Sequence, residues 1–207
     1  MNRLIRNIFQ GQLNRGLMVK VMGALLLDRT TRKNITWSTN EFEKMPDVFF
    51  DAKPSNDSEY IQILGRIRNE RAIKWIRRDY VGDVENLNYY KVYLSGAFGT
   101  GDYGEKISTP IIGEPGLGST ETFLSVGTFN TCEEAENLVK YIKSKFARAL
   151  LGIAKSTQAN TPEKWKYVPL QDFTNQSDID WSGSIHDIDL QLYKKYKQDQ
   201  NAKKLFR

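Results

Sequence analysis

Three glycines in the sequence have the spacing of a dinucleotide-binding loop. Gly99, Gly101 and Gly104 lie in "LSGAFGTGDYGE" and follow "YYKVY", which is a plausible strand. In a loop of that kind the glycines let a pyrophosphate approach closely, and a helix opens directly afterwards with its N-terminus facing the phosphates. The following residues include Pro110, Pro115 and several more glycines, which leave no helix of useful length. We therefore expect a glycine-rich loop that binds no nucleotide cofactor.

A second stretch suggests metal chemistry. "PDVFFDAK" places Asp47, Asp51 and Lys53 in the order found in metal-dependent nucleases, where two acids bind one metal beside a lysine. That arrangement needs the acids on adjacent strands, but here both would lie on one extended segment. A small metal-dependent nuclease of a restriction system stays open as an alternative function.

Other catalytic groups are few. His186 is the only histidine and Cys132 the only cysteine, so no Cys/His metal cluster and no internal disulfide can be built. The chain also has no Asn/Asp-Pro-Pro-Tyr/Phe tetrapeptide, which an adenine methyltransferase needs. We expect no catalytic residue, no metal ligand and no cofactor on this chain.

The most basic stretch is "RIRNERAIKWIRRDY", residues 66–80, which interleaves basic and aromatic side chains. If residues 72–76 form a strand, alternation sends Lys74 to one face and Ile73 and Trp75 to the other. A basic rim over an apolar underside suits contact with phosphates, while a solvated hairpin surface is the alternative. The basic residues of this stretch are Arg66, Arg68, Arg71, Lys74, Arg77 and Arg78.

Composition limits the class of protein. The chain has 207 residues, 40% hydrophobic and 27% charged, with a net charge of +5 and one cysteine. These values are typical of a globular protein with a real core, in a reducing compartment, and we expect a cytoplasmic location. The longest apolar run, residues 17–27, is too short to span a bilayer and predicts a buried helix.

Several elements must position these residues. A basic N-terminal extension, residues 1–45, is expected to be helical, and a basic tail covers residues 197–207. Between them, residues 46–196 are expected to form one domain. Its short strand candidates are residues 60–64, 72–76, 89–95, 109–113, 122–127 and 166–173.

The clearest helix signal starts at Thr131, which forms a capping box with Glu134. Apolar residues, among them Phe146, follow at helical spacing and predict one helix over residues 131–154. Ser184 is a candidate cap for a last helix. The expected fold is mixed α/β, of the α+β type, with a short-stranded sheet and hairpins packed on a long C-terminal helix.

The order of five stretches resembles a known family. "YKVYLSGAFGTGDYGE", "IIGEPGLGSTETFLSVGTF", "EEAENLVKYIKSKFARALLGIAKSTQ", "WKYVPLQDF" and "IDWSGSIHDIDLQLYKKY" together resemble the C-terminal, TaqI-like target-recognition region of adenine-specific restriction–modification DNA methyltransferases. The resemblance covers residues 47–196. In such enzymes an N-terminal domain binds S-adenosylmethionine and methylates adenine, and the C-terminal region grips the duplex and reads its sequence.

The resemblance implies a DNA-recognition module without the catalytic domain. S-adenosylmethionine would then bind only to a domain that this sequence lacks, and a separate methyltransferase or nuclease subunit is a possible partner beside double-stranded DNA. The chain would be a specificity subunit, a truncated product or a remnant, and a non-catalytic protein that assembles with a methylase is a further alternative. The glycine-rich loops would be recognition loops, with Lys91, Ser95, Thr100, Lys155 and Gln158 at the DNA surface beside the basic stretch.

Overall fold

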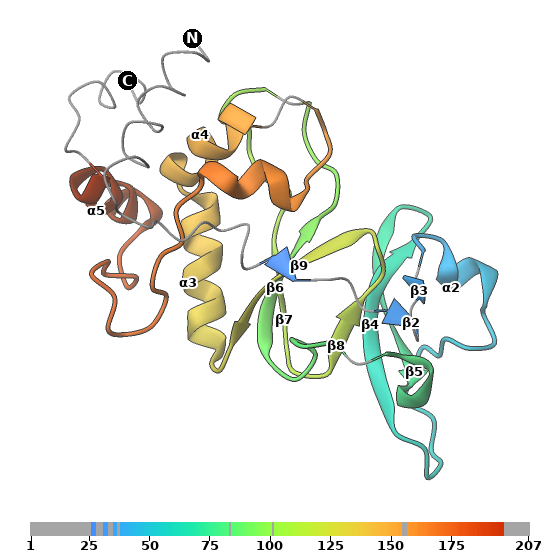
Figure 1. Cartoon of the computed structure of the whole chain (residues 1–207). Helices are drawn as coiled ribbons and strands as arrows, with labels where there is room; N and C mark the ends of the chain where they lie inside the picture. Colours follow the sequence, from blue (N-terminus) through green and yellow to red (C-terminus); the bar gives the residue numbers. More distant parts are fainter. Residues whose placement is uncertain are drawn as a thin grey trace. The chain divides into compact units, whose positions relative to one another are not determined.

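The computed structural model describes residues 38–82, 84–100, 102–154 and 157–196, together with the backbone of three two-residue strands near the N-terminus (Figure 1). Those strands are β1 (Leu26–Leu27), β2 (Thr31–Arg32) and β3 (Ile35–Thr36). The expected basic tail, residues 197–207, lies outside the described residues. None of the helices within the described ranges is long and apolar enough to cross a membrane.

The named strands all precede Cys132, and the longer helices all follow them; the sheets are small and mainly antiparallel, which confirms the mixed α+β class. The remaining strands are β4 (Tyr60–Ile67), β5 (Glu70–Arg77), β6 (Tyr90–Ser95), β7 (Ile111–Gly113), β8 (Leu117–Ser119) and β9 (Phe123–Phe129). The helices are α2 (Glu41–Lys44), α3 (Cys132–Lys143), α4 (Lys145–Ala154) and α5 (Ile185–Tyr196), and the 3-10 helices are η2 (Arg78–Tyr80) and η3 (Pro162–Tyr167).

Contacts divide the chain into two compact units. The sheet unit comprises Leu26–Ala97 and Thr109–Ala135, and the described part of the helical unit falls within residues 98–108 and 136–196. Each unit is assembled from separate stretches of chain. The single domain expected over residues 46–196 stays a prediction.

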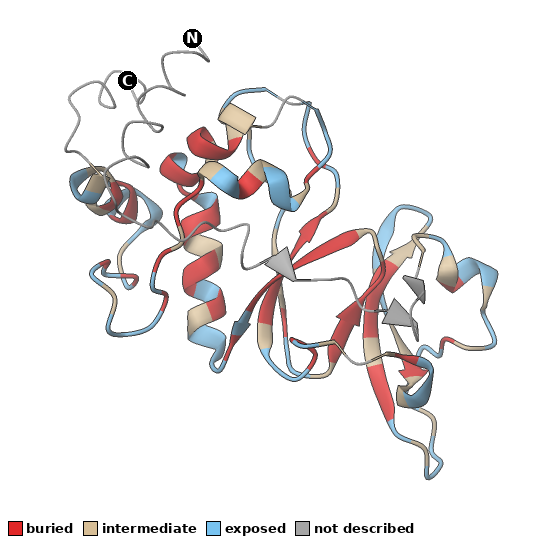
Figure 2. Cartoon of the chain, viewed as in Figure 1, coloured by how far each residue is buried: buried red, intermediate tan, exposed pale blue. Residues whose placement is uncertain are grey.

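Two sheets build the sheet unit. One has the order β1-β9-β6-β7 and the other the order β5-β4-β8, in which β4 pairs antiparallel with β5 and parallel with β8. A core cluster of Leu64, Tyr93, Leu117 and Phe123 brings side chains of both sheets together. β6 and β9 are buried along almost their whole length, because apart from Lys91 their residues are apolar, aromatic or small on both faces (Figure 2).

The other face of the β4–β5 hairpin packs on a second cluster. Ile61, Ile63 and Ile76 meet Phe42 of α2 and Phe49 there. The two phenylalanine rings pack edge to face, with their centroids 4.7 Å apart. Burial on both faces fixes the register of β4 against β5, since a slip of one residue would send apolar side chains to the wrong face.

The helical unit differs from the sequence expectation at Ser144. The helix expected over residues 131–154 is broken there into α3 and α4. The Ser144 hydroxyl accepts the N–H of Ala147 at 3.0 Å, as a capping residue does, so a new helix starts where the old one ends. The capping box at the start of α3 is confirmed, since Thr131 Oγ1 accepts the N–H of Glu134. Phe146 is buried, as its place in the apolar stripe predicts.

Two further expectations are wrong. The strand expected over residues 166–173 is not formed, because Pro162 starts a 3-10 helix that runs to Tyr167 and buries Trp165. The helix expected over the apolar run ends in a strand instead, since Leu26–Leu27 pairs with β9 as β1. The rest of that run, and the first 25 residues of the expected helical extension, lie outside the described residues.

Candidate nucleic-acid interface

The β4–β5 hairpin ends in a short exposed tip, residues 66–71. Below it the chain is tightly packed, because a Cβ on Gly65 would lie 2.7 Å from the Phe42 ring. Within the tip, residues 68–71 are exposed, and Arg68 and Asn69 form the turn with φ values of 47° and 68°. Positive φ at both central residues of a two-residue loop is the mark of a type I′ turn, which matches the twist of the flanking strands.

Arg66 and Arg71 face each other across this tip. They are direct partners in the antiparallel register, so their side chains leave the same face of the hairpin. Arg66 donates to the carbonyl of Asn69 and lies over the Phe123 ring, 5.7 Å from its centroid. Arg71 donates to the carbonyl of Thr109 at 2.8 Å. Within the described part of the chain, neither guanidinium is ion-paired with a carboxylate.

The turn itself presents two more polar side chains. The backbone N–H of Arg68 donates to the Glu43 carboxylate at 3.2 Å, which holds the turn. The Arg68 guanidinium and the Asn69 carboxamide have no hydrogen-bond partner among the residues that the structure describes. Asn69 was missed as a candidate. The sequence has no Asn-Gly or Asp-Gly pair at this turn, so the only local signal that points to it is an asparagine between two runs of strand-forming residues.

The other basic residues of the stretch form ion pairs or hydrogen bonds with groups of the protein itself. Lys74 forms an ion pair with Asp51. Arg77 forms a two-pronged pair with Asp79, at 3.1 Å from Nε to Oδ1 and 2.6 Å from Nη2 to Oδ2, and this hydrogen-bonded pair raises the pKa of Arg77. Arg78 donates to the carbonyl of Val81 at 2.7 Å.

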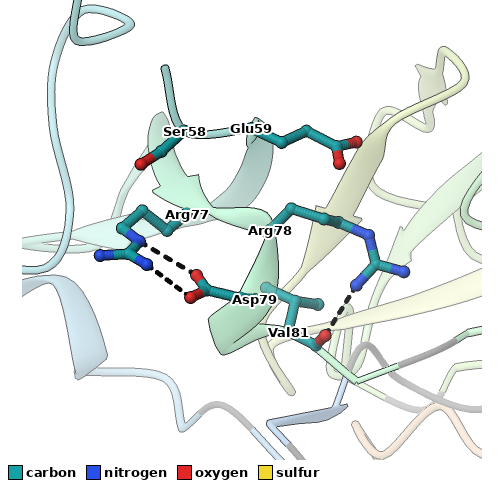
Figure 3. A pocket seen from close by; sticks show the side chains of 6 residues that line it. All are labelled: Ser58, Glu59, Arg77, Arg78, Asp79 and Val81. Carbon is teal, nitrogen blue, oxygen red and sulfur yellow. Dashed lines mark hydrogen bonds and ion pairs between the residues drawn. The ribbon is translucent and has the colours of Figure 1, made fainter. Parts of the chain in front are cut away.

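Arg77 and Arg78 line an open pocket of about 480 Å³ on the sheet unit (Figure 3). Its lining also holds two acids, Glu59 and Asp79, so the two positive charges are balanced. In Figure 3 the Arg77 guanidinium turns to Asp79, and that of Arg78 turns to the carbonyl of Val81. The pocket therefore offers little net attraction for a phosphate. Its lining residues are Ser58, Glu59, Arg77, Arg78, Asp79 and Val81.

The expected basic rim over an apolar underside is reversed. Alternation holds, since Lys74 lies on one face of β5 and Ile73 and Trp75 on the other. However, the face of Lys74 is the buried one: Ile76 on that face is 0% exposed, whereas Ile73 is 45% exposed. The reason is that the Phe42 cluster covers the side of the hairpin that Lys74 shares.

Two candidate residues on β6 are not at a surface. Lys91 is 0% exposed and Ser95 is 4% exposed, because both sit on a strand buried inside the sheet unit. The Lys91 ammonium donates to the carbonyls of Asn86 and Leu87, each at 2.8 Å. Burial lowers its pKa to about 8. Neither side chain can contact DNA without the strand unfolding.

The glycine-rich loop is closed by its own carboxylates. The N–H of Thr100 donates to Glu105 at 2.8 Å, and its hydroxyl donates to Asp102 at 2.6 Å. Gly99 has a φ of 68°, and a Cβ there would lie 2.0 Å from the Glu105 carboxylate. Glycine is thus required because a carboxylate folds over the loop backbone. The predicted contact through Thr100 is weakened, since two acids would oppose a phosphate.

The last two predicted contacts belong to the helical unit. Gln158 is exposed, and its backbone carbonyl accepts the N–H of Phe98 at 3.0 Å. Lys155 lies outside the described residues. The structure therefore gathers Arg66, Arg68 and Arg71 at one place and does not bring Lys91 or Ser95 to any surface.

The residues of the nuclease alternative do not form a metal site. Asp51 is ion-paired with Lys74, and the Lys53 ammonium lies 5.9 Å from the centroid of the Trp75 ring. In the described ranges no three His, Cys, Asp or Glu side chains come together as they would around a metal ion. Of the candidate chemistries, the arginines of the hairpin tip have the geometry that is best suited to an anionic partner.

Comparison with known proteins adds no assignment, since no protein-family model matches the sequence and no curated protein matches it significantly. The resemblance to target-recognition regions stays a prediction that rests on the five sequence stretches.

Proposed function

We propose that this chain is a DNA-recognition module that binds double-stranded DNA through the tip of the β4–β5 hairpin. The observation that carries the proposal is the cross-strand pair of Arg66 and Arg71, which has no carboxylate partner among the described residues. Like charges directly opposite each other on a sheet destabilise it. A phosphate between the two guanidinium groups would remove that repulsion.

The chemistry of arginine supports a phosphate as the partner. Each guanidinium has five N–H donors in a planar fork that fits phosphate oxygens. Arg66 and Arg71 each donate a hydrogen bond from a terminal guanidinium nitrogen to a backbone carbonyl, which orients the fork. Because Arg71 and Arg68 are exposed, a duplex can reach these groups without any rearrangement of the core.

The resemblance gives the proposal its biological context. In a restriction–modification system the module would supply sequence recognition, and S-adenosylmethionine would bind to a methyltransferase on another chain or domain. A cytoplasmic location fits this role and is part of the proposal. The chain would then act by bringing a catalytic partner to its DNA site.

Gel-shift titration tests the proposal. The 207-residue chain is titrated into a labelled random-sequence duplex with Mg²⁺ present, and the expected result is a shifted band that weakens with salt, without cleavage. No shift at low salt would contradict the proposal, and co-purification with a methylase would then favour the interaction-protein alternative. Cleavage that is lost on Asp51→Ala would favour the nuclease alternative.

A further inference from the structure

We infer that the hairpin tip enters the DNA major groove and that Arg68 and Asn69, in its turn, are the residues that read base edges. The inference rests on the proposed function and specifies it. It replaces the glycine-rich loops, which the family resemblance would assign to recognition, by the two-residue turn of a β-ribbon.

The dimensions of the tip suit the groove. The major groove of B-DNA admits a two-stranded antiparallel ribbon, whereas the minor groove is about half as wide. The β4–β5 ribbon is paired in register from Tyr60 and Arg77 to the last pair, Ile67 and Glu70. Tight packing reaches as far as Gly65, and the exposed residues of the tip lie beyond it.

The place of each residue on the ribbon indicates whether it can contact phosphates or base edges. Arg66 and Arg71 stand behind the turn on one face of the ribbon, where they can contact phosphates at the groove edge. Arg68 and Asn69 lie at the very end of the ribbon, in the turn. An arginine can donate twice to the O6 and N7 atoms of guanine, and an asparagine can pair with the N6 and N7 atoms of adenine. Both side chains are exposed and unpaired within the described chain.

The turn conformation supports a role for these two residue types. A type I′ turn is most stable with Asn-Gly at its centre, yet here arginine occupies the first position at a φ of 47°. Arginine in the left-handed region is strained relative to residues that favour this conformation, such as asparagine and glycine. Arg68 therefore places a long cationic side chain at a position where a neutral asparagine would give a more stable turn.

Because type I′ turns favour Asn-Gly, the side chains of Arg68 and Asn69 can be replaced without destabilising the fold. Arg68→Asn with Asn69→Gly installs the favoured Asn-Gly turn and removes both reading groups. A duplex is first selected from a random-core library by the unchanged chain. The double variant is expected to melt at the same or a higher temperature and to bind the selected duplex about 10- to 100-fold more weakly. Its affinity for an unselected duplex should stay within about twofold.

The groove is tested with modified bases in the selected duplex. Replacing guanine and adenine by their 7-deaza forms removes an acceptor from the major groove only, and replacing guanine by inosine removes an amino group from the minor groove only. Weaker binding to the 7-deaza duplex, with inosine tolerated, is the expected result. The reverse pattern would overturn the inference.

The inference and the proposed function fail in different ways. If the double variant keeps the sequence preference of the unchanged chain, the turn does not read DNA although the module binds it. If the unchanged chain binds no duplex, the proposed function fails and the inference falls with it. A variant that loses affinity for all duplexes equally would show phosphate contact at the turn and would also contradict base reading.

Discussion

The carboxylate of Asp189, on α5, accepts the backbone N–H of Phe146 at the start of α4, with 2.9 Å between Oδ1 and N. Its other oxygen accepts the N–H of Lys145 at 3.1 Å. Asp189 is 3% exposed, so one buried carboxylate caps a helix that belongs to a distant part of the sequence. A negative charge there also interacts favourably with the positive end of the α4 dipole.

Asp189→Ala is therefore expected to lower the free energy of unfolding by about 2 kcal/mol. The change removes the partner of two N–H groups and leaves the one at Phe146 buried without an acceptor. Urea unfolding followed by circular dichroism measures the effect. Lys194→Ala, an exposed change on the same helix, is the control and should stay within about 0.5 kcal/mol. Equal effects of the two changes would contradict the capping role.

Lys91 gives the protein a predicted pH dependence. Its folded pKa is lowered to about 8, while the unfolded value is near 10.5. Between these values the unfolded chain holds one more proton than the folded chain, so stability should rise with pH, by at most about 1.4 kcal/mol per pH unit. Above pH 10 the trend should reverse, because burial raises the pKa of Tyr93 and Tyr141 and only the unfolded tyrosines ionise.

Unfolding of the unchanged chain and of Lys91→Met at pH 7.5, 8.5 and 9.5, roughly spanning that window, isolates this contribution. Methionine keeps the volume of the side chain but has no titrating group. The difference in unfolding free energy between the two proteins should shift in favour of the unchanged chain as the pH rises. A difference that is constant across the window would show that Lys91 stays fully protonated in the fold.

Gly99 and Gly104 form a matched pair in the glycine-rich loop. Both have positive φ, at 68° and 70°, but only at Gly99 would a Cβ collide, with the Glu105 carboxylate. Gly104→Ala is expected to cost about 1 kcal/mol from backbone strain alone. Gly99→Ala should cost about 1 kcal/mol more, because it also displaces the hydrogen bond from Thr100 to Glu105.

A double-mutant cycle checks the explanation for Gly99. With Glu105→Ala in the background, no carboxylate lies over the loop, and the cost of Gly99→Ala should fall to that of Gly104→Ala. Thermal unfolding of the four proteins of the cycle gives the coupling. No coupling between positions 99 and 105 would mean that the carboxylate does not determine the need for glycine there.

Local patterns in the sequence predicted where strands and helices lie better than they predicted which elements contact one another. The strands around Ile63 and Val92, and the capping box at Thr131, follow from alternation and from cap chemistry within a few residues. The break of the expected helix at Ser144 could not be predicted in this way, because the apolar stripe continues through that position. Besides the local cap by Ser144, the new start is stabilised by Asp189, which lies more than 40 residues away along the chain.

The candidate site was predictable in position but not in detail. The basic stretch does form a hairpin, yet whether a given cation is available depends on tertiary partners. Lys74 and Arg77 form ion pairs with acids. Within the described part of the chain, Arg66 and Arg71 form no such pair. Lys91 resembles any surface lysine in the sequence, and only the pairing of β6 between β7 and β9 buries it.

The salt dependence of duplex binding tests the central claim most directly. The slope of log K against log salt is measured for the unchanged chain, for Arg66→Gln/Arg71→Gln and for Arg77→Gln/Arg78→Gln, on one duplex, with folding verified by circular dichroism. Each lost phosphate contact flattens the slope by about 0.9. The first double variant should flatten it by up to about 2, and the second, whose charges are balanced by Asp79 and Glu59, should leave it unchanged. An unchanged slope in Arg66→Gln/Arg71→Gln would contradict DNA binding through the hairpin tip.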